Sequence, residues 1–495
     1  MAARADNSFD LPRLRVSFGF ENDTRFLEYD DNVAEFFDVK FCQFQPLDCN
    51  PVFAAVSKKH VVICRLSQTA GDANPCDVIN VIRDDDDEAS GCCCTWVKDP
   101  ITGSPYLCVG GVDAKVKIYN VSDGSLVECF VGHGGLTAVK DVNDLATSPV
   151  NSSVVASASD DTSVRIWSID PIHKGQPCLC ILAGEGHSWN LLSLAFHDTG
   201  RYILSSGHDQ VINLWTIPDL PTDPVTTPLQ VHYPHFSTSA VHSGIVDCVA
   251  FYGDHILSRA CHDNVIVLWR IEGFSSDGPP PPQSAAPTPQ SVVPASNEDP
   301  GRLTRSAFVP VTSPLCPAQY TRLLELHTPN CGPQFFMRFK LHHVPGQNPV
   351  LAFCNAAGNI FFWDFKRLTE YRDFMAMLRD PRRDKGKVQT PGWLKPMIPR
   401  QRADAIGRIR MLGSDRESVA SGQTGKTDGS GFSAETLESW ASRYSMEDPQ
   451  EPLRAHKTES SSANFVGRQA AWSPGGEWCV VVGSSNTTLV LQRWA

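Results

Sequence analysis

Short runs of alternating apolar and polar residues recur along the chain, and three of them follow one template. Segments 157–167, 205–215 and 258–269 each begin with small residues, contain an aspartate and end in a tryptophan. Small residues, a tight turn and then period-two alternation predict two antiparallel strands joined by a hairpin. The aspartate lies six residues before the tryptophan in each segment: Asp161 and Trp167, Asp209 and Trp215, Asp263 and Trp269.

Repetition at this period is typical of a β-propeller, in which each blade takes roughly 40–45 residues. Four further units complete a count of seven blades: one that begins near 36–44, one from 92–97 to Tyr119, one that ends at Trp363 and one at 468–494. The chain ends in a strand, so an N-terminal strand must close the ring. We assign this strand to residues 25–29. The sequence therefore predicts an all-β fold class, a seven-bladed WD-repeat β-propeller over residues 25–495 after a tail of residues 1–24.

Two long insertions interrupt the predicted ring, at residues 275–318 and 367–466. The first is rich in proline, serine and alanine, which predicts disorder or partial polyproline II structure. The second begins with helical apolar spacing at 367–380 and continues through a serine- and glycine-rich linker at 414–433. Its composition favours a solvated loop.

Basic residues gather within the second insertion and suggest a contact with nucleic acid through residues 379–411. They are Arg379, Arg382, Arg383, Lys385, Lys387, Arg400, Arg402, Arg408 and Arg410. Contacts with phosphates make binding steeply dependent on salt. Deleting 379–411 is therefore expected to weaken the binding of DNA or RNA, in a salt titration, by any complex that contains the protein. An unchanged affinity would refute this contact.

A histidine precedes three of the repeats: His133, His187 and His242. In WD repeats such a histidine joins a strand hydroxyl, the turn aspartate and the tryptophan in one hydrogen-bonded chain, which satisfies polar groups that blade packing buries. A catalytic histidine–aspartate pair is the alternative. Recurrence at blade spacing favours the structural role, because an active site needs one such pair and not three.

The net charge, the cysteines and the lengths of the apolar segments exclude several classes of protein. The chain of 495 residues carries a net charge of −12, which excludes the whole protein as an electrostatic DNA binder. Its 17 cysteines lie largely in strand-like runs without paired zinc spacing, and no segment has the apolar length of a signal peptide or membrane span. We expect buried thiols in a reducing compartment, cytosol or nucleus. The acidic run 84–88 could bind a cation, although a charge run of this kind is usually a solvated loop.

No catalytic motif emerges from the sequence. It contains no glycine-rich phosphate loop, no G-x-S-x-G and no H-E-x-x-H. Aromatic pairs at 36–37 and 335–336 open two of the blades, near one mouth of the expected channel. Aromatic faces can surround a quaternary ammonium group, but aromatic residues are also common in strands. We therefore predict a binding protein without enzyme activity, cofactor or metal.

Longer segments resemble the EED/ESC family, the WD-repeat subunit of Polycomb repressive complex 2. The resemblance is most specific in 232–270, which contains HYPHFST and VDCVAFYGDHILS, and extends to 128–135 and 184–215. It covers roughly 25–274, 319–366 and 465–495. The resemblance implies a nuclear, non-catalytic scaffold whose partners are the histone H3 tail, an Enhancer-of-zeste-type methyltransferase on the opposite face, and the other subunits of Polycomb repressive complex 2. No membrane partner is implied.

The resemblance also implies a cage for a trimethylated lysine. Phe37, Phe335 and Phe336 match family cage aromatics, whereas Cys92 stands where the family has a tyrosine. This departure leaves three aromatic walls from matched positions, unless a neighbouring loop supplies another aromatic. The matched residues expected to hydrogen-bond and orient the histone peptide are Arg338, Arg468 and Asp247. The competing interpretation is a generic WD-repeat adaptor, for example in ubiquitin ligation or RNA processing, which needs no such cage.

Overall fold

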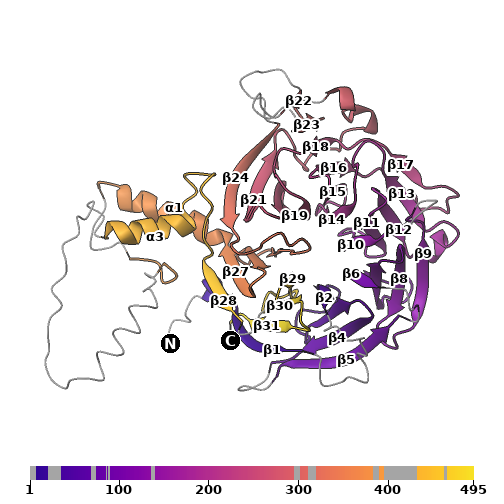
Figure 1. Ribbon diagram of the computed structural model, residues 1–495, viewed down its shortest axis with the longest axis horizontal. Coiled ribbons are helices and arrows are strands. Elements are labelled where there is room, and N and C mark those ends of the chain that lie inside the picture. Colours follow the sequence, from indigo (N-terminus) through magenta and orange to yellow (C-terminus); the bar gives the residue numbers. More distant parts are fainter. Residues whose placement is uncertain are drawn as a thin grey trace.

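A computed structural model describes residues 7–19, 35–68, 74–84, 86, 90–134, 140–291, 293–294, 302–309, 319–382, 389–394, 432–461 and 465–494. Seven sheets surround a central channel in sequence order, as the labels of Figure 1 show. The prediction of a seven-bladed propeller is confirmed. Within the described part, no helix is both long and apolar enough to cross a membrane.

The first three blades follow one another without a long insertion. Blade one contains β2 (Phe36–Phe41), β3 (Val52–Ser57), β4 (His60–Leu66) and β5 (Cys76–Arg83). Blade two contains β6 (Gly91–Lys98), β7 (Pro105–Gly111), β8 (Lys115–Asn120) and β9 (Leu126–Val131). Blade three contains β10 (Val142–Thr147), β11 (Val154–Ser159), β12 (Val164–Ser168) and β13 (Cys178–Leu182), with β17 (Leu229–Val231) added parallel to β13.

The remaining blades complete the ring. Blade four contains β14 (Leu191–Phe196), β15 (Tyr202–Gly207), β16 (Ile212–Thr216) and β18 (Phe236–Thr238). Blade five contains β19 (Val246–Tyr252), β20 (His255–Ala260), β21 (Val265–Ile271) and β24 (Tyr320–His327). Blade six contains β25 (Lys340–His342), β26 (Val350–Cys354), β27 (Asn359–Asp364) and β28 (Lys457–Ser460). Blade seven contains β29 (Gly467–Trp472), β30 (Trp478–Gly483), β31 (Thr488–Gln492) and β1 (Arg13–Phe18).

The closing strand is β1 and not residues 25–29, which lie outside the described part. β1 pairs antiparallel with β31, from Arg13 opposite Gln492 to Phe18 opposite Thr488. The segment RLRVSF alternates, so that Val16 and Phe18 pack on the core beside blade seven while the other face is polar. Closure with this strand places part of the expected tail of residues 1–24 in the propeller.

The two insertions hold more regular structure than their composition predicts. In the first, β23 (Leu303–Ser306) and β22 (Val293–Pro294) extend the sheet of blade four, and two short 3-10 turns, η3 (Gln283–Ala285) and η4 (Pro289–Ser291), precede them. Similar turns occur at η1 (Asn7–Phe9) and η2 (Pro171–His173). The second insertion contains α1 (Phe365–Arg379), close to the expected helix, α3 (Ala434–Tyr444) and the outer strand β28 of blade six.

The two helices lie side by side outside the ring, next to blade six (Figure 1). Tyr371 and Phe374 of α1 contact Tyr444 and Trp440 of α3, with ring centroids 5.6 and 6.3 Å apart. All four side chains are buried in one cluster with the core of blade six. This burial explains why the solvated-loop interpretation was wrong here: the apolar positions of both helices cover a face of the blade. The linker 414–431 and most of the basic segment lie outside the described residues.

The repeated histidines make one pattern of hydrogen bonds in three blades. His133 contacts the carboxylate of Asp161 at 2.9 Å and the hydroxyl of Ser157 at 2.6 Å, and Trp167 donates to the same hydroxyl at 2.7 Å. The corresponding sets are His187, Asp209, Ser205 and Trp215, and His242, Asp263, Ser258 and Trp269. Burial lowers the pKa of His133 and His242 despite their aspartates. These histidines have a structural role.

Candidate functional site

The inner strands of the blades all start at the same mouth of the channel, and the expected cage positions gather there. Phe37 follows the first residue of β2, Cys92 follows the first residue of β6, and Phe335 and Phe336 lie shortly before β25. In β2 the side chain of Phe36 is buried in the core, whereas that of Phe37 is half-buried. The pairing of β2 with β3 shifts register between Phe36 and Asp38, so Phe37 is the extra residue of a β-bulge, and its side chain is turned out of the core.

The loop before β25 presents two aromatic rings. The rings of Phe335 and Phe336 lie 5.2 Å apart between centroids, and Phe335 is 38% exposed. Phe336 has a φ of 57°, a left-handed conformation that is uncommon for a bulky residue and is maintained only where the surroundings fix it. Arg468 supplies one such restraint, because its Nη1 donates to the carbonyl of Phe335 at 2.8 Å while its Nε donates to Glu35 at 2.7 Å.

Arg338 and Asp247 were expected to contact a peptide, but in the structure their side chains bond to other parts of the protein. Both are buried, and buried charges require partners within the protein. Arg338 lies across the channel and donates to the carbonyls of Asn143 and Leu192 at 2.8 and 2.7 Å. Its guanidinium lies over the ring of Phe336, 5.4 Å from the centroid. Arg338 thus holds Phe336, and its expected contact with a peptide stays a prediction.

Asp247 forms a fully buried ion pair with Arg259. Two Nη1–carboxylate distances are 2.7 and 2.6 Å. The pair also holds the aromatic loop: Met337 donates its backbone N–H to Asp247 at 3.2 Å, and Arg259 donates to the carbonyl of Met337 at 3.3 Å. Asp247 therefore supports the aromatic rings from below and does not reach the surface. The sequence contains one signal for this pair. Arg259 is a charged residue at a position where the other two repeats have the small residues Ala158 and Ser206.

Cys92 contributes no aromatic wall. Its side chain is half-buried, and the thiol donates to the carbonyl of Val142 at 2.9 Å. The thiol thus points toward the neighbouring blade three. The mouth retains Phe37, Phe335 and Phe336 from the expected set, and the fourth position is smaller and more open than a tyrosine would make it.

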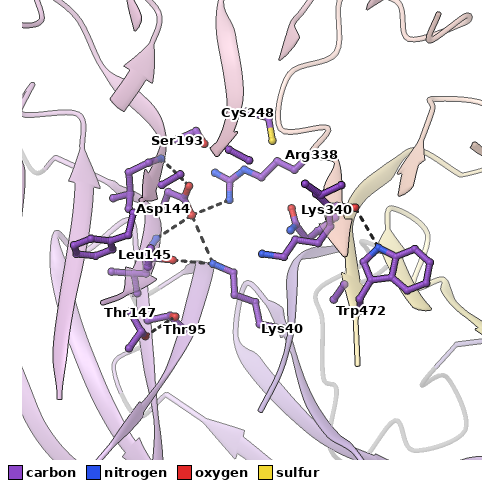
Figure 2. A pocket seen from close by; sticks show the side chains of 18 of the residues that line it. Lys40, Thr95, Asp144, Leu145, Thr147, Ser193, Cys248, Arg338, Lys340 and Trp472 are labelled. Carbon is purple, nitrogen blue, oxygen red and sulfur yellow. Dashed lines mark hydrogen bonds and ion pairs between the residues drawn. The ribbon is translucent and has the colours of Figure 1, made fainter. Parts of the chain in front are cut away.

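Below the mouth, the channel widens into a polar cavity of about 460 Å³. Figure 2 shows Arg338 and Lys40 directed at Asp144, with Lys340 extending into the same space. Lys40 donates to the carbonyl of Leu145 at 2.7 Å. Burial opposes the charge of Lys40, but Asp38 and Asp144 outweigh it and raise the lysine pKa.

Of these channel residues only Arg338 was singled out from the sequence, because nothing in the repeat pattern marks Lys40, Asp144 and Lys340. Their charges tie blades one, three and six together below the aromatic mouth, and this arrangement fixes the mouth's shape. Within the described residues, no group of three or more His, Cys, Asp or Glu side chains is arranged to hold a metal ion. All cysteines of the described part are free thiols, and most are buried.

Seven blades, each built on four antiparallel strands, and His–Ser–Trp–Asp networks in three of them define a WD-repeat β-propeller, here with an aromatic mouth. The family model of the WD domain, G-beta repeat, matches residues 124–168 and 177–216. Polycomb protein EED of Chaetomium thermophilum is 46% identical, over 100% of this chain and 98% of that relative. Polycomb protein esc of Drosophila melanogaster is 28% identical, over 52% of this chain and 60% of that relative.

Solved structures give the same result over the full chain. A crystal structure of the Chaetomium thermophilum polycomb repressive complex 2 contains a chain with 49% identity and a TM-score of 0.83, with 99% of each chain covered. A structure of ctPRC2 in complex with H3K27me3 and H3K27M contains a chain with 49% identity, a TM-score of 0.84 and the same coverage. The chain belongs to the Polycomb EED family.

Proposed function

We propose that this protein is a non-catalytic subunit of Polycomb repressive complex 2 that binds a trimethylated lysine of the histone H3 tail at the aromatic mouth. The observation that carries the proposal is the loop of Phe335 and Phe336, which the buried Asp247–Arg259 pair and Arg468 hold at the channel entrance beside Phe37. Fixed aromatic faces attract a methylated ammonium through their quadrupoles and exclude water from its methyl groups.

The partners follow from the family. The similar chain in the complex with H3K27me3 supports the histone tail as the ligand of this mouth. The methyltransferase is a separate subunit, which we place on the opposite face of the propeller. A subunit of this kind acts on chromatin, so we propose that the protein lies in the nucleus, where it supports gene silencing. A generic WD-repeat adaptor is not favoured, because the identity extends over the full chain to an EED protein.

Cys92 weakens the cage in this proposal without abolishing it. Partly exposed cation–π contacts contribute roughly 0.5–1 kcal/mol each and about 2 kcal/mol when desolvated. One missing wall therefore costs something like three- to thirty-fold in affinity. Three walls still give preference for a trimethylated lysine over an unmodified one.

The test is a calorimetric titration of trimethylated and unmodified histone H3 peptides. We expect the wild type to prefer the trimethylated peptide. Phe336→Ala should lose affinity by about tenfold, and Cys92→Tyr should gain about three- to thirty-fold. Phe44→Ala is a matched control, because Phe44 is also half-buried but follows the far end of β2. Equal binding of both peptides by the wild type would mean that the fold persists without the reader function.

A further inference from the structure

An exposed aromatic surface continues from the aromatic loop onto blade four. Trp189 is 60% exposed, and its ring lies 5.9 Å from that of His208. His208 lies 5.7 Å from Phe335, edge to face, and Phe335 lies 5.2 Å from Phe336. Four rings from blade four and from the loop before blade six thus form one connected surface at the mouth.

Blade four holds the first two rings in place. Trp189 follows Ser188, whose backbone N–H donates to Asp209 at 3.0 Å, a member of the buried WD network. The backbone N–H of His208 donates to the carbonyl of Asn190 at 2.9 Å. The backbone positions are therefore fixed, while the indole itself faces solvent. A tryptophan on a rigid backbone with most of its surface exposed is typical of a binding surface, because tryptophans dominate the energetics of interfaces.

Two carboxylates lie beside the start of β14, which follows Trp189: Asn143 Nδ2 donates both to Asp160 and, at 2.7 Å, to the carbonyl of Leu191. Asp160 donates its backbone N–H to the carbonyl of Asp141 at 3.0 Å, and its carboxylate accepts from Asn143 at 2.6 Å. Burial raises the pKa of Asp141, and the nearby charge of Asp160 adds to that rise. Burial also raises the pKa of Asp160, and the nearby His208 opposes that rise. Lys140 is the neighbouring cation of both. Half-buried carboxylates next to aromatic faces favour a further cation.

We propose that Trp189, His208 and the Asp141–Asp160 pair bind a basic residue next to the trimethylated lysine of the histone tail. Arginine fits best, because its planar guanidinium stacks on an aromatic face while its N–H groups donate to carboxylates. Two observations select this occupant: the surface is continuous with the cage, and its charge is complementary to a basic tail. The inference rests on the proposed function, since the cage sets the register of the peptide.

A double-mutant cycle with the full chain tests the inference. The probes are two trimethylated histone H3 peptides, one with arginine next to the trimethyl-lysine and one with alanine in its place. Trp189→Ala should weaken binding of the arginine peptide by about three- to tenfold and change binding of the alanine peptide by less than about twofold. Trp189→Phe should retain most of the affinity, and Asp160→Asn should also reduce the preference for arginine.

Ile101→Ala provides the matched control, because Ile101 is 76% exposed on the β6–β7 turn at the other end of its blade. Equal losses for both peptides in Trp189→Ala would overturn the inference, as would no loss for either while the wild type still prefers trimethyl-lysine. A wild type without that preference would instead refute the proposed function. The unmodified peptide in the same titration series separates these two failures.

Discussion

Replacing Asp247 with alanine is expected to lower the free energy of unfolding by about 3–5 kcal/mol, because the guanidinium of Arg259 would remain buried without its counter-ion. Arg259 is 1% exposed, so water does not replace the carboxylate. The same change removes the acceptor for the backbone N–H of Met337. We therefore expect loss of trimethyl-lysine binding together with loss of stability, measured by chemical denaturation and peptide titration.

The surface pair of Arg379 and Glu447 is the matched control. Its distance of 2.9 Å is similar, but the two side chains are 64% and 71% exposed. Glu447→Ala should change the stability by at most about 1 kcal/mol. If Asp247→Ala does not fold, Asp247→Asn can be measured instead. This variant retains an acceptor for Met337, and its stability should lie between those of the wild type and Asp247→Ala. A variant Asp247→Ala as stable as the wild type would contradict the support role.

Replacing Asp209 with alanine is expected to cost about 1–3 kcal/mol of unfolding free energy, because His187 and two backbone N–H groups lose their acceptor. Those groups belong to Ser188 and Val211. The stability loss should appear in thermal unfolding whether or not a peptide is present. If the melting temperature were retained and only ligand binding were lost, the structural role of the WD networks would be wrong.

The pH dependence of this effect has a defined sign. Burial raises the pKa of Asp209, but the interaction with His187 and the hydrogen bonds outweigh burial, so the folded pKa is lowered. The stabilisation is therefore fully present above the unfolded pKa of about 3.9 and is lost as the pH falls through the lower folded pKa. The stability difference between wild type and Asp209→Asn should shrink only in that acidic range. A difference that vanished near neutral pH would point to another group.

The class of fold follows from the residue pattern alone. Period-two alternation and the fixed spacing of aspartate and tryptophan specify blade hairpins, because each such unit must bury its apolar face against the next. The positions of residues within the repeats also predicted the histidines of the networks and the aromatic loop. The residue pattern also located α1, whose apolar spacing repeats at the helical period.

The identity of the strand that closes the ring became clear from contacts in the folded chain. RLRVSF and RFLEY are both short strand-like segments near the N-terminus, and pairing with β31 is a contact across the whole length of the chain. Local sequence contains no information on such long-range pairing beyond the alternation of Leu14, Val16 and Phe18. The same holds for the second insertion. Its helices form because they pack on the core of blade six, and β28 forms because it pairs with β27.

The candidate site shows the same division. Residue type and position placed Phe37, Phe335 and Phe336 at one mouth, because inner strands of a propeller start at the same end. The sequence did not reveal that Arg338 and Asp247 are buried, since a charge on an alternating strand is compatible with either face until its partner is known. Arg259, Asn143 and Leu192 are those partners, and they come from other strands. Asp247 pairs with Arg259 inside blade five, whereas Arg338 reaches across the channel to blades three and four, an arrangement that requires the closed ring. Both side chains support the aromatic mouth, and their contacts with a peptide stay predictions.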